Sequence, residues 1–262
     1  MPRFAPPRVE AEALAGGGMI LRSPLALGAI DRCVGVWLEA WAGRAGERVY
    51  LAERAGTGWR TITYAAAHQA ARAIGEALLK RSLGPERPIL ILSDNGIDHA
   101  LLTLGAMQAG VPVAPVSTAY SRLSQDFAKL KGIVALLEPG LVFADDGERY
   151  GAALRTLDWR GAEVVSSANP ARGVATTAFA DLLKTRPTAA VDDAFRRVGP
   201  ETIAKFLFTS GSTGEPKAVI NTQRMLCANQ AAVAQVWPFL EDRPPVLVEW
   251  LPWNHTFGGN HN

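Results

Sequence analysis

Short, continuously apolar runs alternate with longer stretches of helical spacing in the first half of the chain. Residues 88–92 form an apolar run that is typical of a strand buried on both faces. Residues 97–109 then carry apolar side chains at helical spacing and stop at Gly110, a residue type that commonly ends helices. A second apolar run follows at 111–116. This order predicts an α/β fold with a mostly parallel, layered sheet flanked by helices.

The same patterns predict further elements on both sides of this unit. Strands are expected at 61–63, 133–137, 141–143, near Val164, and at 203–208, 218–221 and 246–250. Helices are expected at 66–78, 121–131, 150–157, 179–183, and from a cap at Thr222 to Trp237. Residues 238–245 and 251–262 are expected to be loops.

The domain organisation follows from composition along the chain. Residues 1–30 are rich in Pro and Gly and are predicted to form an extended or irregular arm. Residues 31–262 are predicted to belong to one domain. The chain stops at Asn262, just after a Gly pair and an aromatic stretch, whereas domains usually end in polar residues. We therefore expect an N-terminal fragment of a longer domain.

Overall composition excludes several classes of protein. The chain has 262 residues, 48% of them hydrophobic, and a net charge of +2, which excludes extensive disorder and gives no support for a nucleic-acid partner. Its longest apolar stretch is interrupted by Gly and Pro, so no membrane span is predicted. Two cysteines, Cys33 and Cys227, are too few for a disulfide framework and lack metal-ligand spacing. We expect buried thiols, no metal site built by the chain itself, and a cytoplasmic protein.

Nine residues between two predicted strands carry the clearest chemical signal. Residues 209–217 read Thr-Ser-Gly-Ser-Thr-Gly-Glu-Pro-Lys. Glycines let backbone N–H groups approach a ligand closely, and successive N–H groups form an anion-binding nest. The hydroxyls add donors, and Lys217 adds a positive charge. The segment therefore predicts a polyphosphate-binding loop.

Two common phosphate motifs do not fit this segment. The Walker A loop needs Gly-Lys-Ser/Thr at the start of a helix, whereas Lys217 follows Pro216 and precedes a predicted strand. The dinucleotide motif needs a third glycine besides Gly211 and Gly214. A solvent-exposed hairpin turn is the alternative interpretation of the same residues.

The segment 209–217 resembles the phosphate-loop signature of the acyl-adenylate-forming superfamily, which includes acyl-CoA and aryl-CoA synthetases. Ala218 departs from it, because the usual residue there is Gly. Residues 251–259, Leu-Pro-Trp-Asn-His-Thr-Phe-Gly-Gly, resemble the next motif of that superfamily, at the acyl-binding site. Residues 93–95, with 106–115, are similar to its first motifs, and residues 220–230 with 250–260 are most similar to bacterial feruloyl-CoA synthetases.

The resemblance implies an ATP-dependent acid–CoA ligase. A carboxylate, of ferulate or a related aryl acid, would attack the α-phosphate of ATP to give an acyl-adenylate and pyrophosphate. Coenzyme A would then displace AMP. ATP with Mg²⁺ and coenzyme A are the implied co-substrates. Family members are about twice as long, so the residues that hold adenine, ribose and Mg²⁺ would lie outside this chain, which we expect to be inactive alone.

The resemblance also implies roles for individual residues. The phosphates of ATP would be bound by Thr209, Ser210, Gly211, Ser212, Thr213 and Gly214. Lys217 would neutralise the leaving pyrophosphate, and His255 would orient the substrate carboxylate. Phe257 and Gly258 would line the acyl pocket with His255. Trp250 and Trp253 are equally consistent with an aryl pocket and with core packing.

Two other functions remain compatible with the sequence. The acyl group could pass to a carrier protein instead of coenzyme A. The chain could also be a truncated, non-catalytic product that binds a nucleotide.

Overall fold

A seven-stranded sheet forms the centre of the molecule in the computed structural model, which describes residues 4–209, 216–242 and 244–260. The strands lie in the order β11-β10-β6-β5-β7-β8-β9, and every neighbouring pair is parallel except β10 and β11. Their bounds are Ile89–Leu92 (β5), Val113–Pro115 (β6), Leu141–Asp146 (β7), Glu163–Ala168 (β8), Thr176–Ala178 (β9), Ile203–Thr209 (β10) and Lys217–Thr222 (β11).

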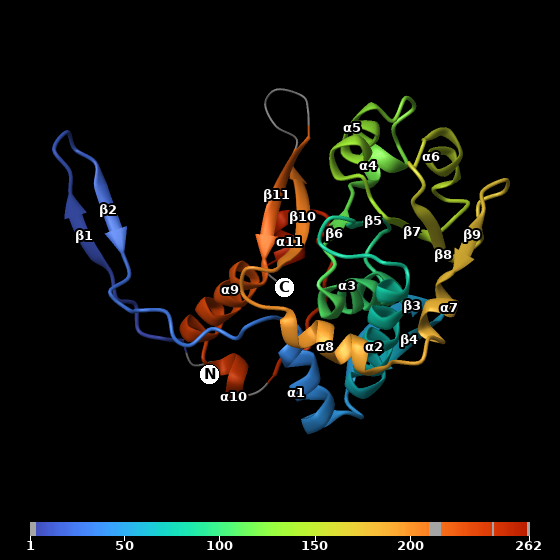
Figure 1. The fold of residues 1–262 in the computed structure, drawn as a ribbon. Coiled ribbons are helices and arrows are strands. Elements are labelled where there is room, and N and C mark those ends of the chain that lie inside the picture. The colour runs from blue at the N-terminus through green and yellow to red at the C-terminus, as the bar shows by residue number, and fades with distance from the viewer. Residues whose placement is uncertain (1–3, 210–215, 243, 261–262) are drawn as a thin grey trace.

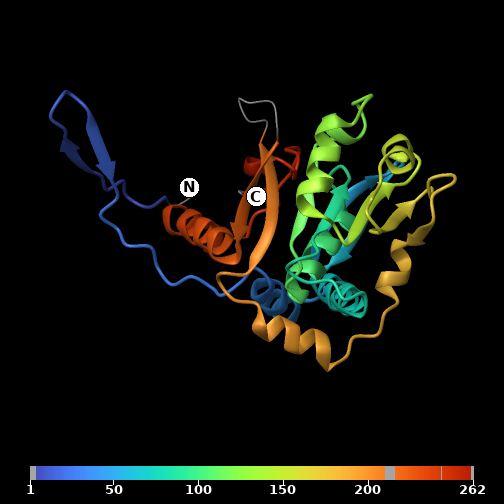
Figure 2. The ribbon, with the colours of Figure 1, turned by 45° about the horizontal axis from the view of Figure 1, so that its top comes forward.

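Helices cover both faces of this sheet, which confirms the predicted fold class (Figures 1 and 2). One face packs against α2 (Tyr64–Lys80), α3 (Ile97–Ala109) and α7 (Phe179–Leu183). The other face packs against α5 (Ala128–Leu137) and α6 (Gly151–Thr156). Strand β5 contributes Ile89 and Ile91 to the first layer and Leu90 and Leu92 to the second, and all four are fully buried. The continuous apolar run therefore marks a strand with no solvent face.

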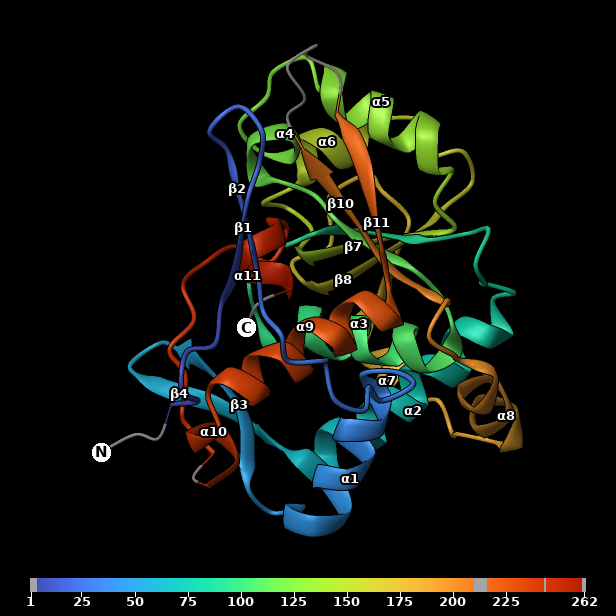
Figure 3. The same ribbon diagram turned by 90° about the vertical axis from the view of Figure 1, so that its left-hand side faces the viewer.

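The remaining elements surround these layers. They are the hairpins β1 (Glu10–Ala13) with β2 (Met19–Arg22) and β3 (Val49–Ala55) with β4 (Gly58–Thr63), and the helices α1 (Gly35–Ala45), α4 (Thr118–Ser121), α8 (Ala189–Arg197), α9 (Gln223–Val236), α10 (Phe239–Asp242) and α11 (Thr256–Asn260). Helix α9 leads from the end of β11 to α10 (Figure 3). Within the arm 1–30, expected to be extended or irregular, the β1–β2 hairpin stands apart from the main sheet in Figure 1.

Several predicted boundaries agree closely with the structure. Helix α3 spans the predicted residues, and Gly110 ends it in the left-handed conformation with φ of 72°. Helix α9 begins after Thr222, whose hydroxyl accepts a hydrogen bond from the Met225 amide at 3.4 Å. The two cysteines are buried, as expected.

Two predicted strands are wrong. Residues 133–137 belong to helix α5, in which Leu130, Ile133 and Val134 are buried at helical spacing. A short apolar run is ambiguous between a strand and one face of a helix, and here the helix occupies 128–137 instead of the predicted 121–131. Residues 246–250 form no strand, since Val246 and Val248 are about nine-tenths exposed and have no strand partner among the described residues.

A buried carboxylate fastens helix α8 to helix α2. Glu76 of α2 is 3% exposed and accepts hydrogen bonds from the Thr188 amide at 3.0 Å and the Thr188 hydroxyl at 2.8 Å. Thr188 is also the N-cap of α8. Burial raises the pKa of the Glu76 carboxyl, but the hydrogen bonds from Thr188 and the charge of Lys80 outweigh it and hold that pKa below its ordinary value.

We therefore expect the Glu76 carboxylate to stabilise the folded protein at neutral pH and to lose this effect in acid. A carboxyl whose pKa is lower in the folded state contributes stability above its unfolded pKa of about 4.3 and loses that contribution as the pH falls towards the folded value. Urea unfolding between about pH 6 and pH 3 should show a smaller loss of stability for Glu76→Gln than for the wild type. The exposed Glu86→Gln is the matched control, and an unchanged pH slope in Glu76→Gln would contradict the assignment.

Candidate functional site

The antiparallel pair β10–β11 brings the two ends of the predicted phosphate loop side by side. Thr209, the last residue of β10, pairs directly with Lys217, the first residue of β11, and both are exposed. The predicted loop residues Ser210, Gly211, Ser212, Thr213 and Gly214 lie outside the described residues. The two strands predicted on either side of residues 210–215 are therefore confirmed, and they place the Thr209 hydroxyl and the Lys217 ammonium group opposite each other.

A cavity lies beside Thr209, at the carboxyl ends of β6 and β10. It measures about 230 Å³, and we name it the Thr209 cavity. Its lining residues are Pro115, Ser117, Tyr120, Phe208, Thr209, Asn254, His255 and Thr256. In α/β sheets, ligands bind outside the carboxyl ends of parallel strands, where consecutive strands diverge to opposite sides. Here β6 and β7 lie on opposite sides of β5.

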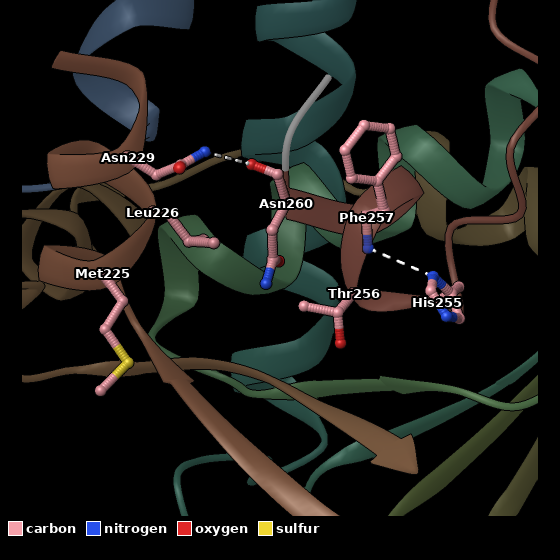
Figure 4. A pocket seen from close by; sticks show the side chains of 7 residues that line it. All are labelled: Met225, Leu226, Asn229, His255, Thr256, Phe257 and Asn260. Carbon is pink, nitrogen blue, oxygen red and sulfur yellow. Dashed lines mark hydrogen bonds between the residues drawn. The ribbon is translucent and has the colours of Figure 1, made fainter. Parts of the chain in front are cut away.

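A second, more apolar cavity lies between helices α9 and α11 (Figure 4). It measures about 460 Å³, and we name it the Phe257 cavity. Its lining residues are Met225, Leu226, Asn229, His255, Thr256, Phe257 and Asn260. His255 and Thr256 line both cavities, so they stand at the junction between the Thr209 cavity and the more apolar Phe257 cavity.

The backbone around His255 forms a tight turn that orients the imidazole. The His255 amide donates to the Pro252 carbonyl at 3.0 Å, and the His255 carbonyl accepts from the Gly259 amide at 2.8 Å. The ring Nδ1 accepts from the Phe257 amide at 3.3 Å. In the neutral imidazole, Nε2 then carries the proton and can donate to a substrate oxygen.

The other acyl-pocket candidates occupy different places. Phe257 lines the Phe257 cavity and is 52% exposed. Gly258 is buried against the turn, where an added Cβ would stand 2.6 Å from the Pro252 carbonyl oxygen, and it is not among the lining residues. Trp250 is 81% exposed, Trp253 packs edge-on against His99, and neither lines a described cavity.

Several residues at this site were not singled out in the sequence. Met225 and Leu226 lie about one turn before Asn229 on α9, a helix whose apolar spacing looks like ordinary core packing. Lys205 interrupts the apolar run of β10 and is 9% exposed, and burial lowers its pKa to about 8. A lone lysine inside a strand was the available signal for a buried polar contact.

The described residues contain neither a candidate metal site nor a candidate membrane-spanning helix. They include no group of three or more His, Cys, Asp or Glu side chains placed to hold a metal ion. None of the described helices combines the length and apolar character that crossing a bilayer requires.

Comparison with known proteins identifies the class of this fold and the family of the chain. The structure superposes on the fatty acyl-adenylate ligase from L. pneumophila, solved with acyl adenylate and pyrophosphate, with a TM-score of 0.63 at 18% identity. That match covers 88% of this chain and 38% of the other. The fold is therefore that of the acyl-adenylate ligases. The model of the AMP-binding enzyme family matches residues 38–261, and the chain belongs to this family.

Two curated relatives show how far the likeness extends. A sulfoacetate–CoA ligase from Cupriavidus necator is 33% identical over 66% of this chain and 32% of its own length. A nonribosomal peptide synthetase from Emericella nidulans is 28% identical over 63% of this chain and 6% of its own length. The chain thus spans about a third or less of the length of these curated relatives.

Proposed function

We propose that the whole protein is an ATP-dependent acid–CoA ligase that activates a carboxylic acid as an acyl-adenylate. Residues 31–262 would supply the N-terminal part of its adenylation domain. The observation that carries this proposal is the position of His255 between the Thr209 cavity, beside the phosphate loop, and the apolar Phe257 cavity. Adenylation needs this arrangement, because the carboxylate of the acid must lie beside the phosphates of ATP while the rest of the acid lies in a separate, apolar space.

The physical obstacle to the first half-reaction is charge, since a carboxylate must approach the triphosphate of ATP. Preorganised donors and cations around the phosphoryl oxygens lower this barrier. We assign the β- and γ-phosphates to the Thr209 hydroxyl and to the loop residues Ser210, Gly211, Ser212, Thr213 and Gly214. Lys217 stands across the hairpin from Thr209, where its ammonium can neutralise the leaving pyrophosphate.

The acyl side of the site follows from the second cavity. His255 Nε2 would donate to the substrate carboxylate and orient it towards the α-phosphate. Met225, Leu226 and Phe257 give the Phe257 cavity an apolar wall, and Asn229 adds an amide. A ring with one or two polar substituents suits such a lining, so we propose ferulate or a related aryl acid as the substrate. Gly258 would support this pocket from behind.

Coenzyme A is the proposed acceptor of the acyl group, in a reaction that we place in the cytoplasm. The likeness to a CoA ligase supports this acceptor. The likeness to a nonribosomal peptide synthetase supports a second candidate, transfer to a carrier protein. A non-catalytic, nucleotide-binding role for the chain alone is the remaining alternative.

Pyrophosphate release tests the proposal. ATP, Mg²⁺ and ferulate are supplied to the 262-residue chain and to the longest form of the protein, with a panel of benzoic, cinnamic and fatty acids in parallel. We expect acid-dependent release by the longer form and little by the chain alone. Adding coenzyme A should give a thioester. Release without thioester would favour the carrier-protein alternative, and no release with any acid would refute adenylation.

A further inference from the structure

The segment that carries His255 is held at its beginning by one side chain. We name residues 251–260 the His255 segment. Asn95 donates from Nδ2 to the Leu251 carbonyl at 2.8 Å and accepts at Oδ1 from the Trp253 amide at 3.0 Å. These two bonds imitate a strand pairing, although Asn95 lies 156 residues away in the loop between β5 and α3.

The Asn95 loop is itself anchored to the body of the molecule. The Asp94 carboxylate forms ion pairs with Arg122 at 3.5 Å and Arg149 at 3.4 Å. The His99 ring, near the start of α3, lies with Nδ1 3.3 Å from the Asp94 carbonyl oxygen and packs edge-on against Trp253 at 5.1 Å. Asn95 therefore contacts the His255 segment from a loop that is itself held in place by these contacts.

The end of the His255 segment is held by a second group of side chains. Lys205 of β10 donates from Nζ to the Gly259 carbonyl. The Asn260 carbonyl accepts from Asn229 and Gln230 of α9, each at 3.1 Å, and the Asn260 side chain donates to Asn221 of β11 at 2.7 Å. Strands β10 and β11 and helix α9 all contribute to this end.

Lys205 is a costly residue to bury for stability alone. It forms no ion pair among the described residues, and its hydrogen bond goes to a neutral carbonyl. A charged group removed from water without an opposite charge is destabilising unless hydrogen bonds compensate for it. An apolar residue would suit the run Ile-Ala-Lys-Phe-Leu-Phe better, so the amine serves the contact with Gly259.

We propose that Asn95 and Lys205 are positioning residues that hold the two ends of the His255 segment, and thereby fix the imidazole at the junction of the two cavities. The catalytic half of this inference rests on the proposed function. The structural half does not, because it concerns the order of residues 251–260 in the chain as it exists.

Amide hydrogen exchange on the 262-residue chain tests the structural half. We compare Asn95→Ala and Lys205→Met with the wild type and with Thr177→Val, which deletes a remote hydrogen bond of 2.7 Å to Glu163. Loss of Asn95 should speed exchange about tenfold at His255 and Gly259 as well as at Trp253. Lys205→Met should also speed amide exchange about tenfold at His255 and Gly259, with no loss of thermal stability. Thr177→Val should leave all three amides unchanged.

Steady-state kinetics of the longest form test the catalytic half. Both variants should lower kcat for acid-dependent pyrophosphate release by about 10- to 100-fold, while the KM for ATP changes little, because the phosphate loop is untouched. Faster exchange at Trp253 alone, with normal kcat, would overturn the proposal. If the wild type adenylates no acid, the proposed function fails, and the exchange data still decide whether the two residues order the segment.

Discussion

Lys217→Met is expected to reduce acid-dependent pyrophosphate release by about 10²- to 10³-fold, the loss typical of removing one preorganised donor from a developing anion. Lys217 is the first residue of β11 and pairs with Thr209 across the hairpin, so its backbone position is fixed by the sheet. Its side chain is exposed, so the substitution should leave the free energy of unfolding nearly unchanged. A loss of catalysis without a loss of stability is the expected signature.

Two companion variants separate charge from geometry at this position. Lys217→Arg keeps the positive charge on a bulkier, planar group and should retain more activity than Lys217→Met. Lys184→Met is the matched control, because Lys184 is an exposed lysine that pairs with Asp181 at 3.0 Å. It lies beside α7, which contacts β8 and β9 at the edge of the sheet opposite β11. Inorganic pyrophosphate should also bind the 262-residue chain more weakly after Lys217→Met. If Lys217→Met had the same pyrophosphate affinity and the same reaction rate as the wild type, Lys217 would not be part of the site.

Some of the elements that the sequence predicted well carry an unambiguous local signal. Strand β5 is buried on both faces, so each of its residues is apolar, and α3 ends at a glycine in the left-handed conformation. The errors occur where a short apolar run is compatible with a strand and also with another structure. The apolar residues of 133–137 form one side of α5, and the β-branched residues of 246–250 have no strand beside them among the described residues.

The site was predictable only in part, for a related physical reason. The phosphate loop proposed at 209–217 is local in sequence, so its composition alone suggests its chemistry, and its role stays a prediction. The support of His255 is non-local, because Asn95 and Lys205 contact the His255 segment across 156 and 54 residues of chain. A single sequence contains no signal for such pairs beyond a polar residue where an apolar one would pack better. The Phe257 cavity likewise arises where α9 and α11 meet, which periodicity alone does not reveal.

Gly105→Val is expected to lower the free energy of unfolding by about 3 kcal/mol, at the upper end of the costs of overpacking a core. Gly105 lies in α3 where this helix crosses α2. An added Cβ would stand 2.6 Å from Ile74 Cβ and Cγ2 and 3.0 Å from the Ala71 carbonyl oxygen. The nearest of these atoms belong to a fully buried, β-branched side chain and to backbone, so neither can move aside cheaply.

A second helical glycine supplies the control for this prediction. Gly43 is exposed in α1, and no heavy atom lies within 4 Å of the position that a Cβ would occupy there. Gly43→Ala should raise the free energy of unfolding by roughly 0.5–1 kcal/mol, because alanine restricts the unfolded chain and favours the helix. Urea unfolding followed by tryptophan fluorescence measures both changes. If Gly105→Val unfolded at the wild-type urea concentration, α2 and α3 could not be packed as closely as the structure has them, and the layer that supports β5 and the Asn95 loop would have to be rebuilt.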